Sequence, residues 1–397
     1  MSIGVLKDVV KLCHNAKVPM FLWGHHGIGK SSLVQQVTNE LDIGFVDYRA
    51  AQIEATDLRG YPKEVDGKTV YCPPIELPQE TSPTKVVEKM MDNLNNKNKE
   101  GIILFDELNR AADPVIQASF QLFVEGRLGT YVKPKGWSCM AAGNFGGSYN
   151  VNDFCQAFIG RFCHVTLSVD EEYLSEWASY ILKTYDDNSI TQKIIQFICG
   201  SVDNINVVSN QDLGFKIERS PRLWEQVVKI EREIEIQNRS KEKTKYSKEA
   251  QDLVLAGLIG DMAVTYRRAK FDIVPRDILN EGVARLKSIK VDRSILSGLV
   301  YGIVGMVESL GNKIKEEQIS NVMDFTSWLC DKKDEADLGL VICHRLFVKQ
   351  FGESTNVVMA NEKVAKIVSA DNPWLKELIK HKKVHEFTRT LYEEGSK

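Results

Sequence analysis

The chain has 397 residues, of which 43% are hydrophobic and 26% charged, and its formal net charge is -3. The length suits two or three domains, and the near-neutral charge argues against a globally basic nucleic-acid-binding protein but leaves room for a local basic patch. No charged-then-apolar leader opens the sequence, and no apolar run approaches the ~20 residues of a membrane span. Since the eight cysteines include no C-x-x-C pair, we expect reduced thiols and a cytoplasmic protein without a membrane span.

The first informative segment is GHHGIGKS at residues 24–31, which fits the phosphate-loop pattern G-x-x-x-x-G-K-[ST]. An apolar strand is predicted before it at 18–23 and a helix after it at 32–37, the context that the pattern requires. Glycines let backbone N–H groups point at phosphate oxygens, Lys30 is placed to reach the β- and γ-phosphates, and Ser31 to hold Mg²⁺. The less favoured alternative is a glycine-rich turn that binds nothing. The predicted nucleotide-binding residues are Gly24, Gly27, Ile28, Gly29, Lys30, Ser31 and Ser32.

Apolar periodicity and turn residues predict the elements around this loop. Asp66-Gly67 between apolar residues is a strong β-hairpin signal, and we expect a structure that projects from the core there. Ser220-Pro221 predicts a helix start, with serine at the N-cap and proline at the first helical position. The other elements expected in the first part of the chain are helix 1–17, strand 44–49, helix 83–95, helix 114–125, hairpin 125–131, strand 137–144, helix 153–162 and strand 163–167.

The segment GIILFDE at 101–107 carries two carboxylates at the end of a predicted strand. Its four consecutive apolar residues predict a strand covered on both faces, and ligands of open α/β sheets bind where such strands end. Beside a phosphate loop, Asp106 is placed to organise Mg²⁺ through water, and Glu107 to orient and deprotonate the attacking water. The alternative, that these acids only cap the next helix, loses weight once the phosphate loop is considered.

Two more polar residues stand at the ends of later elements. Asn144 ends the strand predicted at 137–144, where its amide is placed to position the hydrolytic water. The residue is also suited to a turn, so its role stays open on these grounds. Arg161 lies on the short helix predicted at 153–162, beyond the core strands.

Strand, loop and helix alternate up to about residue 169, which predicts an α/β fold with a parallel sheet and helices on both faces. Beyond that point strand signals nearly disappear and helical periodicity dominates, with one helix expected at 248–271. We therefore expect three parts, namely an α/β nucleotide-binding core at 1–169, an all-helical lid at 170–290 and a helical C-terminal extension at 291–397.

Together these residues resemble an AAA+ ATPase, and more narrowly one of the MoxR-type branch, over roughly residues 1–290. Residues 24–31 match Walker A and residues 102–107 match Walker B, while DELNRA at 106–111 resembles the DE-[IL]-NRA sequence of that branch. The resemblance implies the AAA+ fold, with a helix-2 insert and a pre-sensor hairpin. Their expected places are residues 52–80 and 126–136.

The resemblance also implies roles for three residues outside the Walker motifs. Asn144 falls at the sensor-1 position, and Arg161 resembles the arginine finger of a DRF motif, although Gly160 replaces the usual aspartate. Arg222, in the sequence Ser-Pro-Arg, resembles sensor 2. The implied cofactors are ATP and Mg²⁺, with Ser31 and Asp106 on the metal. The implied catalytic residues are Lys30, Asp106, Glu107, Asn144, Arg161 and Arg222.

An arginine finger implies a closed homo-oligomeric ring, most commonly a hexamer, in which Arg161 acts on a neighbour's nucleotide. The resemblance implies an ATP-hydrolysing remodelling chaperone that acts on a partner or client protein. A von Willebrand factor A-domain partner would be a separate polypeptide, because the C-terminal part shows neither strands nor a D-x-S-x-S motif. The insert residues expected to face the pore or a partner are Arg59, Tyr61, Tyr131 and Lys133.

Two alternative functions stay open. One is a nucleic-acid-stimulated motor, which the acidic net charge and the lack of a basic-aromatic stripe disfavour. The other is a nucleotide-gated scaffold for which hydrolysis is not essential.

Overall fold

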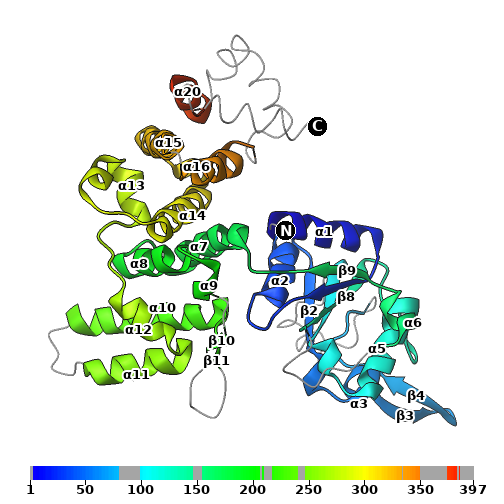
Figure 1. The fold of residues 1–397 in the computed structure, drawn as a ribbon. Helices are drawn as coiled ribbons and strands as arrows, with labels where there is room; N and C mark the ends of the chain where they lie inside the picture. Colours follow the sequence, from blue (N-terminus) through cyan, green and yellow to red (C-terminus); the bar gives the residue numbers. More distant parts are fainter. Residues whose placement is uncertain are drawn as a thin grey trace. The chain divides into compact units, whose positions relative to one another are not determined.

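The computed structural model describes residues 3–79, 99–145, 154–205, 208–209, 217–239, 246–332, 334–348, 373–381 and 384. The chain consists of two compact units, Met1–Ser168 and Val169–Lys397 (Figure 1). The helix expected at 83–95 lies outside the described residues. The boundary expected at residue 290 lies within the second unit and stays a prediction.

A five-stranded sheet forms the centre of the first unit. Its strands are β1 (Met20–Trp23), β2 (Gly44–Arg49), β5 (Gly101–Asp106), β8 (Trp137–Gly143) and β9 (Cys163–Thr166), in the spatial order β2-β5-β8-β1-β9. Every neighbouring pair is parallel, so the carboxyl ends of all five strands lie at one edge of the sheet. The expected α/β fold with a parallel sheet is confirmed.

Helices cover both faces of this sheet (Figure 1). They are α1 (Ile3–Ala16), α2 (Lys30–Leu41), α3 (Ala55–Arg59), α5 (Asp113–Glu125) and α6 (Gln156–Ile159). On one face, alternate strand residues such as Phe21 and Ile103 join a buried cluster with residues of α5 and α6. The intervening residues, such as Leu22 and Ile102, are equally buried on the side of α1 and α2. Burial on both faces explains the continuous apolar runs of these strands.

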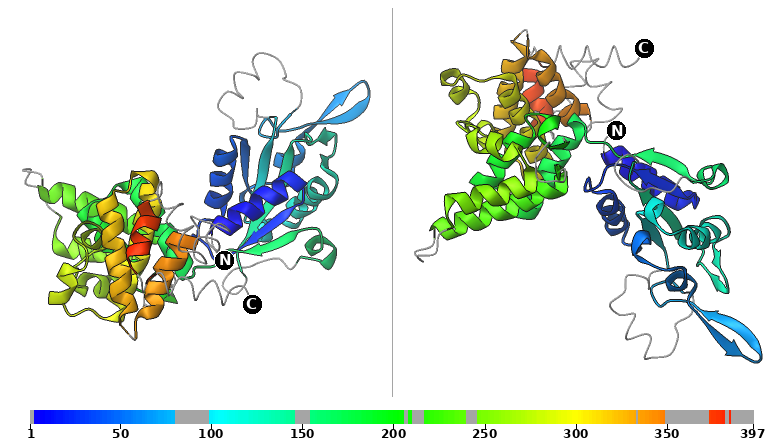
Figure 2. Two further views of the ribbon diagram at one scale, coloured as in Figure 1. Left: turned by 90° about the horizontal axis from the view of Figure 1, so that it is seen from above. Right: turned by 60° about the horizontal axis from the view of Figure 1, so that its bottom comes forward.

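Two antiparallel hairpins belong to the first unit, and the longer one reaches out beyond the sheet (Figure 2). It is made by β3 (Tyr61–Val65) and β4 (Lys68–Cys72), and it turns at Asp66-Gly67, where both φ angles are positive, 51° and 71°. Such a turn matches the twist of the flanking strands, and the hairpin prediction is confirmed. The short hairpin of β6 (Arg127–Leu128) and β7 (Tyr131–Val132) touches it, because the Thr130 hydroxyl donates to the Tyr71 carbonyl at 2.9 Å.

The expectation that Tyr131 faces a pore or a partner is wrong. Its side chain is only 6% exposed, and its hydroxyl donates to the Pro78 carbonyl at 2.8 Å. The reason is the register of the short hairpin, which pairs Tyr131 with the buried Leu128 on the side that faces the core. Lys133 also turns inward and donates to the Trp137 carbonyl, whereas Arg59 and Tyr61 are exposed as expected.

The second unit is helical. A two-stranded sheet of β10 (Val208–Ser209) and β11 (Ile217–Glu218), which the sequence did not predict, accompanies the helices. The helix expected at 248–271 is in fact two helices, since the chain breaks at Gly260, whose φ is +64°. The helices are α7 (Glu171–Tyr185), α8 (Ser189–Ile198), α9 (Val202–Ile205), α10 (Pro221–Arg239), α11 (Lys248–Ile259), α12 (Met262–Arg268), α13 (Pro275–Glu281), α14 (Arg293–Leu310), α15 (Glu316–Cys330), α16 (Ala336–Ile342) and α20 (Pro373–Lys380), with a π-helical turn at Cys343–Val348.

One segment of the described chain, Arg293–Lys313, is long and apolar enough to cross a membrane by length and composition alone. It contains α14, which packs along α7 closely enough that a Cβ on Gly305 would come within 2.6 Å of the Ser175 carbonyl oxygen. Of its most apolar window, 61% is buried inside the structure. Because buried core helices pass the same test, this segment is weak evidence for a membrane span.

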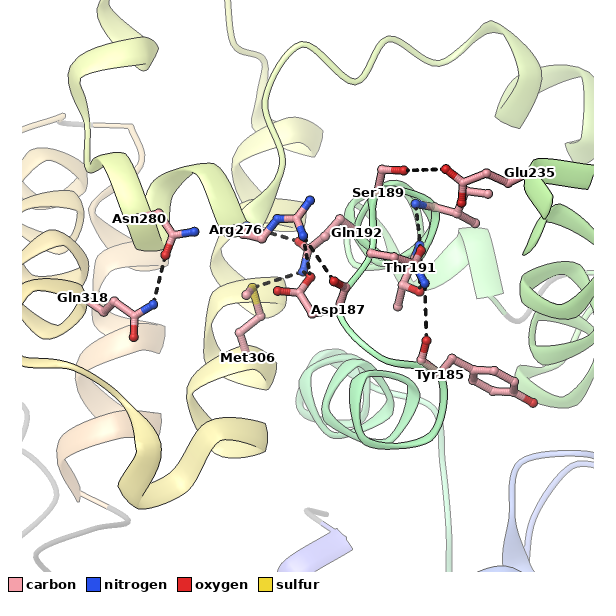
Figure 3. A network of polar contacts seen from close by, with 12 residues as sticks. Tyr185, Asp187, Ser189, Thr191, Gln192, Glu235, Arg276, Asn280, Met306 and Gln318 are labelled. Atoms are coloured by element: carbon pink, nitrogen blue, oxygen red, sulfur yellow. Dashed lines mark hydrogen bonds and ion pairs between the residues drawn. The ribbon is translucent and has the colours of Figure 1, made fainter. Parts of the chain in front are cut away.

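A buried amide ties three helices of the second unit together (Figure 3). The Gln192 side chain on α8 is fully buried; it donates to Asp187 at 2.7 Å and accepts from the backbone N–H of Arg276, on α13, at 3.2 Å. It also contacts the sulfur of Met306 on α14. A buried amide with its donors and acceptor used in this way fixes the positions of the helices that contribute its partners.

Candidate active site

The phosphate loop leaves the sheet between β8 and β9. Backbone hydrogen bonds from Gly24 N to Gly143 O, at 3.2 Å, and from Leu167 N to Trp23 O, at 2.8 Å, hold its start. The loop then enters α2, whose first turn carries no acidic residue and whose N-cap residue, Gly29, has no side chain that could cap it. At a helix start of this kind the first N–H groups point outward along the axis, and the helix dipole favours an anion there.

Two positions of the loop require glycine, one for lack of space and one for its backbone conformation. A Cβ at Gly24 would lie 2.6 Å from the Ile28 side chain and 2.7 Å from the Leu167 carbonyl oxygen, so only glycine fits against β9. Gly29 has a φ of +92°, a left-handed conformation that other residues rarely adopt, and it directly precedes Lys30 at the start of α2. The loop geometry thus depends on the glycines that the sequence pattern requires.

Lys30 and Asn144 are brought together by this geometry. The Lys30 ammonium is buried and donates to the Asn144 side-chain oxygen at 2.6 Å and to the carbonyls of Gly24 and His25, each at 2.9 Å. Asn144 follows β8, the neighbour of β1, so the two residues meet because these strands are adjacent and parallel. A buried cation beside an anion-binding helix start is the arrangement expected for a phosphate site.

Asn109 holds Asn144 in place, a role that the sequence analysis did not assign. Its side chain donates to the Asn144 carbonyl at 2.7 Å and accepts from the Asn144 backbone N–H at 3.3 Å. Asn109 is only 2% exposed and lies in the 3-10 turn Leu108–Arg110 that follows β5. The only signal was its position in the DELNRA sequence, since an asparagine after a strand also suits a turn.

Ser31 and Asp106 form the second pair of the site. The Ser31 hydroxyl donates to Asp106 Oδ2, and the Glu107 backbone N–H donates to Asp106 Oδ1 at 2.8 Å. Asp106 is 4% exposed, so this carboxylate has a fixed orientation at the end of β5. One hydroxyl and one carboxylate, both hard oxygen donors, suit Mg²⁺, which keeps water and substrate phosphates as its other ligands. Among the described residues, no group of three or more acidic, histidine or cysteine side chains is placed to hold a metal ion.

Glu107 adopts an unusual backbone conformation. Its φ is +56° and its ψ is 32°, a left-handed geometry that costs a non-glycine residue free energy and that occurs often at functional sites. The turn places its carboxylate beside the Arg110 guanidinium, at 3.2 Å, with about a third of the side chain exposed. A carboxylate in this position is open to water, as a base that activates a water molecule must be.

Arg49 is a further residue of the site that the sequence analysis missed. It lies at the end of β2, directly opposite Asp106 in the parallel register. Its Nη1 contacts Asp106 Oδ2 at 2.7 Å, and its Nη2 contacts Asp47 Oδ2 at 2.9 Å. Burial raises the pKa of the Asp47 carboxyl, and the positive charge of Arg49 partly offsets this rise.

The two other predicted catalytic residues, Arg161 and Arg222, lie one in each unit. Arg161 follows α6 in the first unit and Arg222 is the second residue of α10 in the second unit; both are exposed. Neither side chain makes an ion pair or hydrogen bond to another described residue. Their assigned roles therefore stay predictions.

Residues 20–121 match the family model described as ATPase family associated with various cellular activities (AAA). This segment contains the phosphate loop, Arg49, Asp106, Glu107 and Asn109, so the match covers most of the site. Over this segment, about a quarter of the chain, the protein is similar to AAA ATPase domains. The comparison does not single out the MoxR-type branch. No curated protein sequence matches the chain.

Solved structures with some similarity include the RuvB Holliday junction branch migration motor of Thermotoga maritima. That protein is 12% identical, with 80% of this chain and 85% of that chain covered and a TM-score of 0.38. A closed-state reconstruction of Hsp104 with ATPyS and FITC casein is 15% identical over 45% of this chain and 34% of that chain, with a TM-score of 0.30. Similarity at this level identifies neither a substrate nor a partner.

Proposed function

We propose that this protein is a Mg²⁺-dependent ATPase that assembles into a ring and uses ATP hydrolysis to remodel a client protein in the cytoplasm. The observation that carries the proposal is the convergence of Lys30, Asn144, Ser31 and Asp106 at one sheet edge, beside the start of α2. Each of these groups has the charge and position that binding and cleavage of a triphosphate require.

The chemistry follows from what each side chain offers. The N–H groups of the loop and the Lys30 ammonium neutralise phosphate charge, and Asn144, fixed by Asn109, orients a polar amide at the same place. Mg²⁺, held by Ser31 and Asp106, would supply further positive charge to the phosphates. Glu107 accepts a proton from the attacking water, for which its exposed carboxylate is suited.

A ring is proposed because cleavage of ATP needs positive charge beside the γ-phosphate in the transition state, and an arginine of a neighbouring molecule can supply it. Arg161 is exposed and makes no ion pair with another described residue, so it is free to serve a neighbouring molecule. An arginine supplied in this way accelerates phosphoryl transfer by about 10³–10⁵ in enzymes of related chemistry.

A protein client is favoured over nucleic acid by the long hairpin. All of its residues except Val70 are exposed, including Tyr61 at 68%, which is unusual for an aromatic side chain without a partner to cover it. Its charges balance, with Lys63 and Lys68 against Glu64 and Asp66, so the hairpin lacks the positive surface that binds phosphate backbones.

Glu107→Gln tests the proposal, with Glu125→Gln, an exposed acid at the end of α5, as the matched control. We expect ATP hydrolysis to fall by about 10²–10⁴ in the first variant while ATP still binds, and both properties to be unchanged in the control. Unaltered hydrolysis in Glu107→Gln would contradict the proposal.

The same variant separates the kinds of client. Held in ATP, Glu107→Gln should retain client protein in a pull-down in which hydrolysing wild-type protein releases it. Recovery of nucleic acid instead, or wild-type hydrolysis that rises with added DNA or RNA, would favour a nucleic-acid motor. If hydrolysis is lost but cellular function is intact, a nucleotide-gated scaffold would be the better description.

A further inference from the structure

Arg49 is the centre of a three-residue charge arrangement at the sheet edge. Its guanidinium bridges Asp47, two residues earlier on the same strand, and Asp106, opposite it on β5. Both contacts are hydrogen-bond length, 2.9 and 2.7 Å, so the group is held at two points and its position is defined.

The contact with Asp106 falls on the oxygen that also accepts from Ser31. Asp106 Oδ2 is therefore shared by the hydroxyl and by Arg49 Nη1, while Oδ1 is occupied by the Glu107 backbone N–H. A cation held between Ser31 and Asp106 must draw on the same oxygen and lie close to the guanidinium. Two positive charges so close, in a partly buried place, repel each other.

We infer that Arg49 sets the metal dependence of nucleotide binding: it competes with Mg²⁺ for Asp106 and supplies positive charge to the site when the metal is absent. The inference rests on the proposed function, since it concerns the same site. Arg49 acts through Asp106 and is thus a positioning residue. With Arg49 present, ADP or ATP binds appreciably without Mg²⁺, and more Mg²⁺ is needed to saturate the complex.

Arg49 is also a residue whose removal the fold tolerates. Its side chain is 44% exposed, and it lies at the last residue of an edge strand, so its loss opens no cavity. Asp106 keeps its two other hydrogen bonds, from Ser31 and from the Glu107 backbone. A change in metal dependence would therefore report on charge at the site.

The test measures binding of a fluorescent ADP analogue, so no turnover is involved. Full-length wild type and Arg49→Gln are titrated with the analogue in EDTA and then, at fixed analogue, with MgCl₂. We expect the half-saturating Mg²⁺ concentration to fall by about tenfold in Arg49→Gln, and its affinity in EDTA to fall by several fold. Arg49→Lys keeps one charge and should lie between the two. Arg127→Gln, an exposed arginine on β6, should match wild type.

The outcomes distinguish the inference from the proposal on which it rests. An Arg49→Gln protein that binds the analogue with an unchanged or higher half-saturating Mg²⁺ concentration would overturn the inference and leave the ATPase proposal intact. If wild type bound no nucleotide at any Mg²⁺ concentration, both would fall. Circular dichroism shows whether each variant is folded; should Arg49→Gln not fold, the shift in Arg49→Lys decides, and its absence overturns the inference.

Discussion

Buried polar and charged side chains are clustered at one place in the first unit and spread among the helices in the second. In the first unit, Lys30, Asp106 and Asn144 come from three different places in the sequence and converge at one edge of the sheet. In the second unit, buried charges are spread between helices, such as Arg345 of the π-helical turn, which contacts Ser175 of α7 at 2.8 Å and Glu308 of α14 at 3.4 Å. Ligands of parallel sheets bind at the carboxyl ends of the strands, whereas the contacts between helices join side chains of the protein to one another.

The comparison implies that the two units respond differently to loss of charge. Removing an exposed charge near the sheet edge, such as Arg161 or Arg110, should alter chemistry and leave folding nearly unchanged, because such a side chain is largely solvated. Removing a buried charge from between the helices should weaken folding and leave the chemistry of the sheet unit unchanged, because it breaks a buried ion pair.

The largest effect on chemistry is expected from Arg161→Ala. If this exposed arginine completes a neighbour's site, ATP hydrolysis at saturating nucleotide should fall by about 10³–10⁵, with nucleotide affinity nearly unchanged. The measurement is steady-state hydrolysis together with nucleotide binding by the purified variant. Arg127→Ala removes another exposed arginine of the same unit and should change neither.

A mixing experiment decides whether Arg161 acts between molecules. Arg161→Ala and Glu107→Gln proteins are each inactive by expectation, but mixed rings contain some sites with an intact base and an intact neighbouring arginine. Hydrolysis by the mixture should therefore exceed the sum of the two variants. A wild-type rate in Arg161→Ala alone would remove the basis for a ring in which arginines are shared.

The second unit should show the converse behaviour in Arg345→Met. The Arg345 side chain is 6% exposed and lies near two carboxylates, Glu176 at 3.6 Å and Glu308 at 3.4 Å, and the variant removes its charge from both of them. Breaking a buried pair in this way costs about 3–5 kcal/mol of unfolding free energy. Urea unfolding measures this loss, and nucleotide binding should persist at low urea. A variant as stable as wild type that no longer binds nucleotide would reverse the comparison.

The fold of the sheet unit was predictable because its signals are local. The strands β2 and β5 begin and end as expected, since apolar runs bounded by turn residues are read directly from the sequence. The helix boundaries of the second unit were harder to predict. Apolar periodicity continues through Gly260, so the break between α11 and α12 was missed, because a glycine inside a periodic segment can either continue a helix or end it with a positive φ.

Site residues within a sequence motif could be predicted, whereas a residue that reaches the site only through the packing of strands could not. Lys30, Ser31 and Asp106 stand in recognisable sequences, and the structure brings them together. Arg49 was missed because its role depends on β2 lying next to β5 in a register that places it opposite Asp106. Strand order and register are long-range properties, which no short segment specifies.

Acid should weaken the sheet unit through His14. Burial lowers the pKa of this imidazole to about 4, and its Nδ1 lies 2.8 Å from the Ser138 hydroxyl, between α1 and β8. In the unfolded chain the pKa is near 6.5, so the stability from keeping His14 neutral is complete above pH 6.5 and is lost as pH falls toward 4. The loss is roughly 3 kcal/mol.

The matched variant for this prediction is His14→Gln, which can still hydrogen-bond to Ser138 but does not titrate. Unfolding free energies from urea titrations at pH 7.5 and 4.5 should differ by about 2.5 kcal/mol more in wild type than in the variant, since pH 4.5 lies just above the folded pKa. An equal pH dependence in the two proteins would show that other groups cause any acid weakening.

The smallest effect on hydrolysis is expected from Arg110→Gln. This variant removes an exposed charge, in direct contrast to the buried Arg345 of the second unit. The pair of Arg110 with Glu107 is partly exposed, at 38% and 32%, and such pairs contribute at most about 1 kcal/mol to stability. Replacing Arg110 should therefore leave the free energy of unfolding nearly unchanged, unlike replacing Arg345. Because its charge occupies Glu107, its loss frees the carboxylate to accept a proton, and hydrolysis should rise by up to about fivefold. Steady-state hydrolysis measures this; a decrease would mean that Arg110 aims Glu107 at the water and does not restrain it.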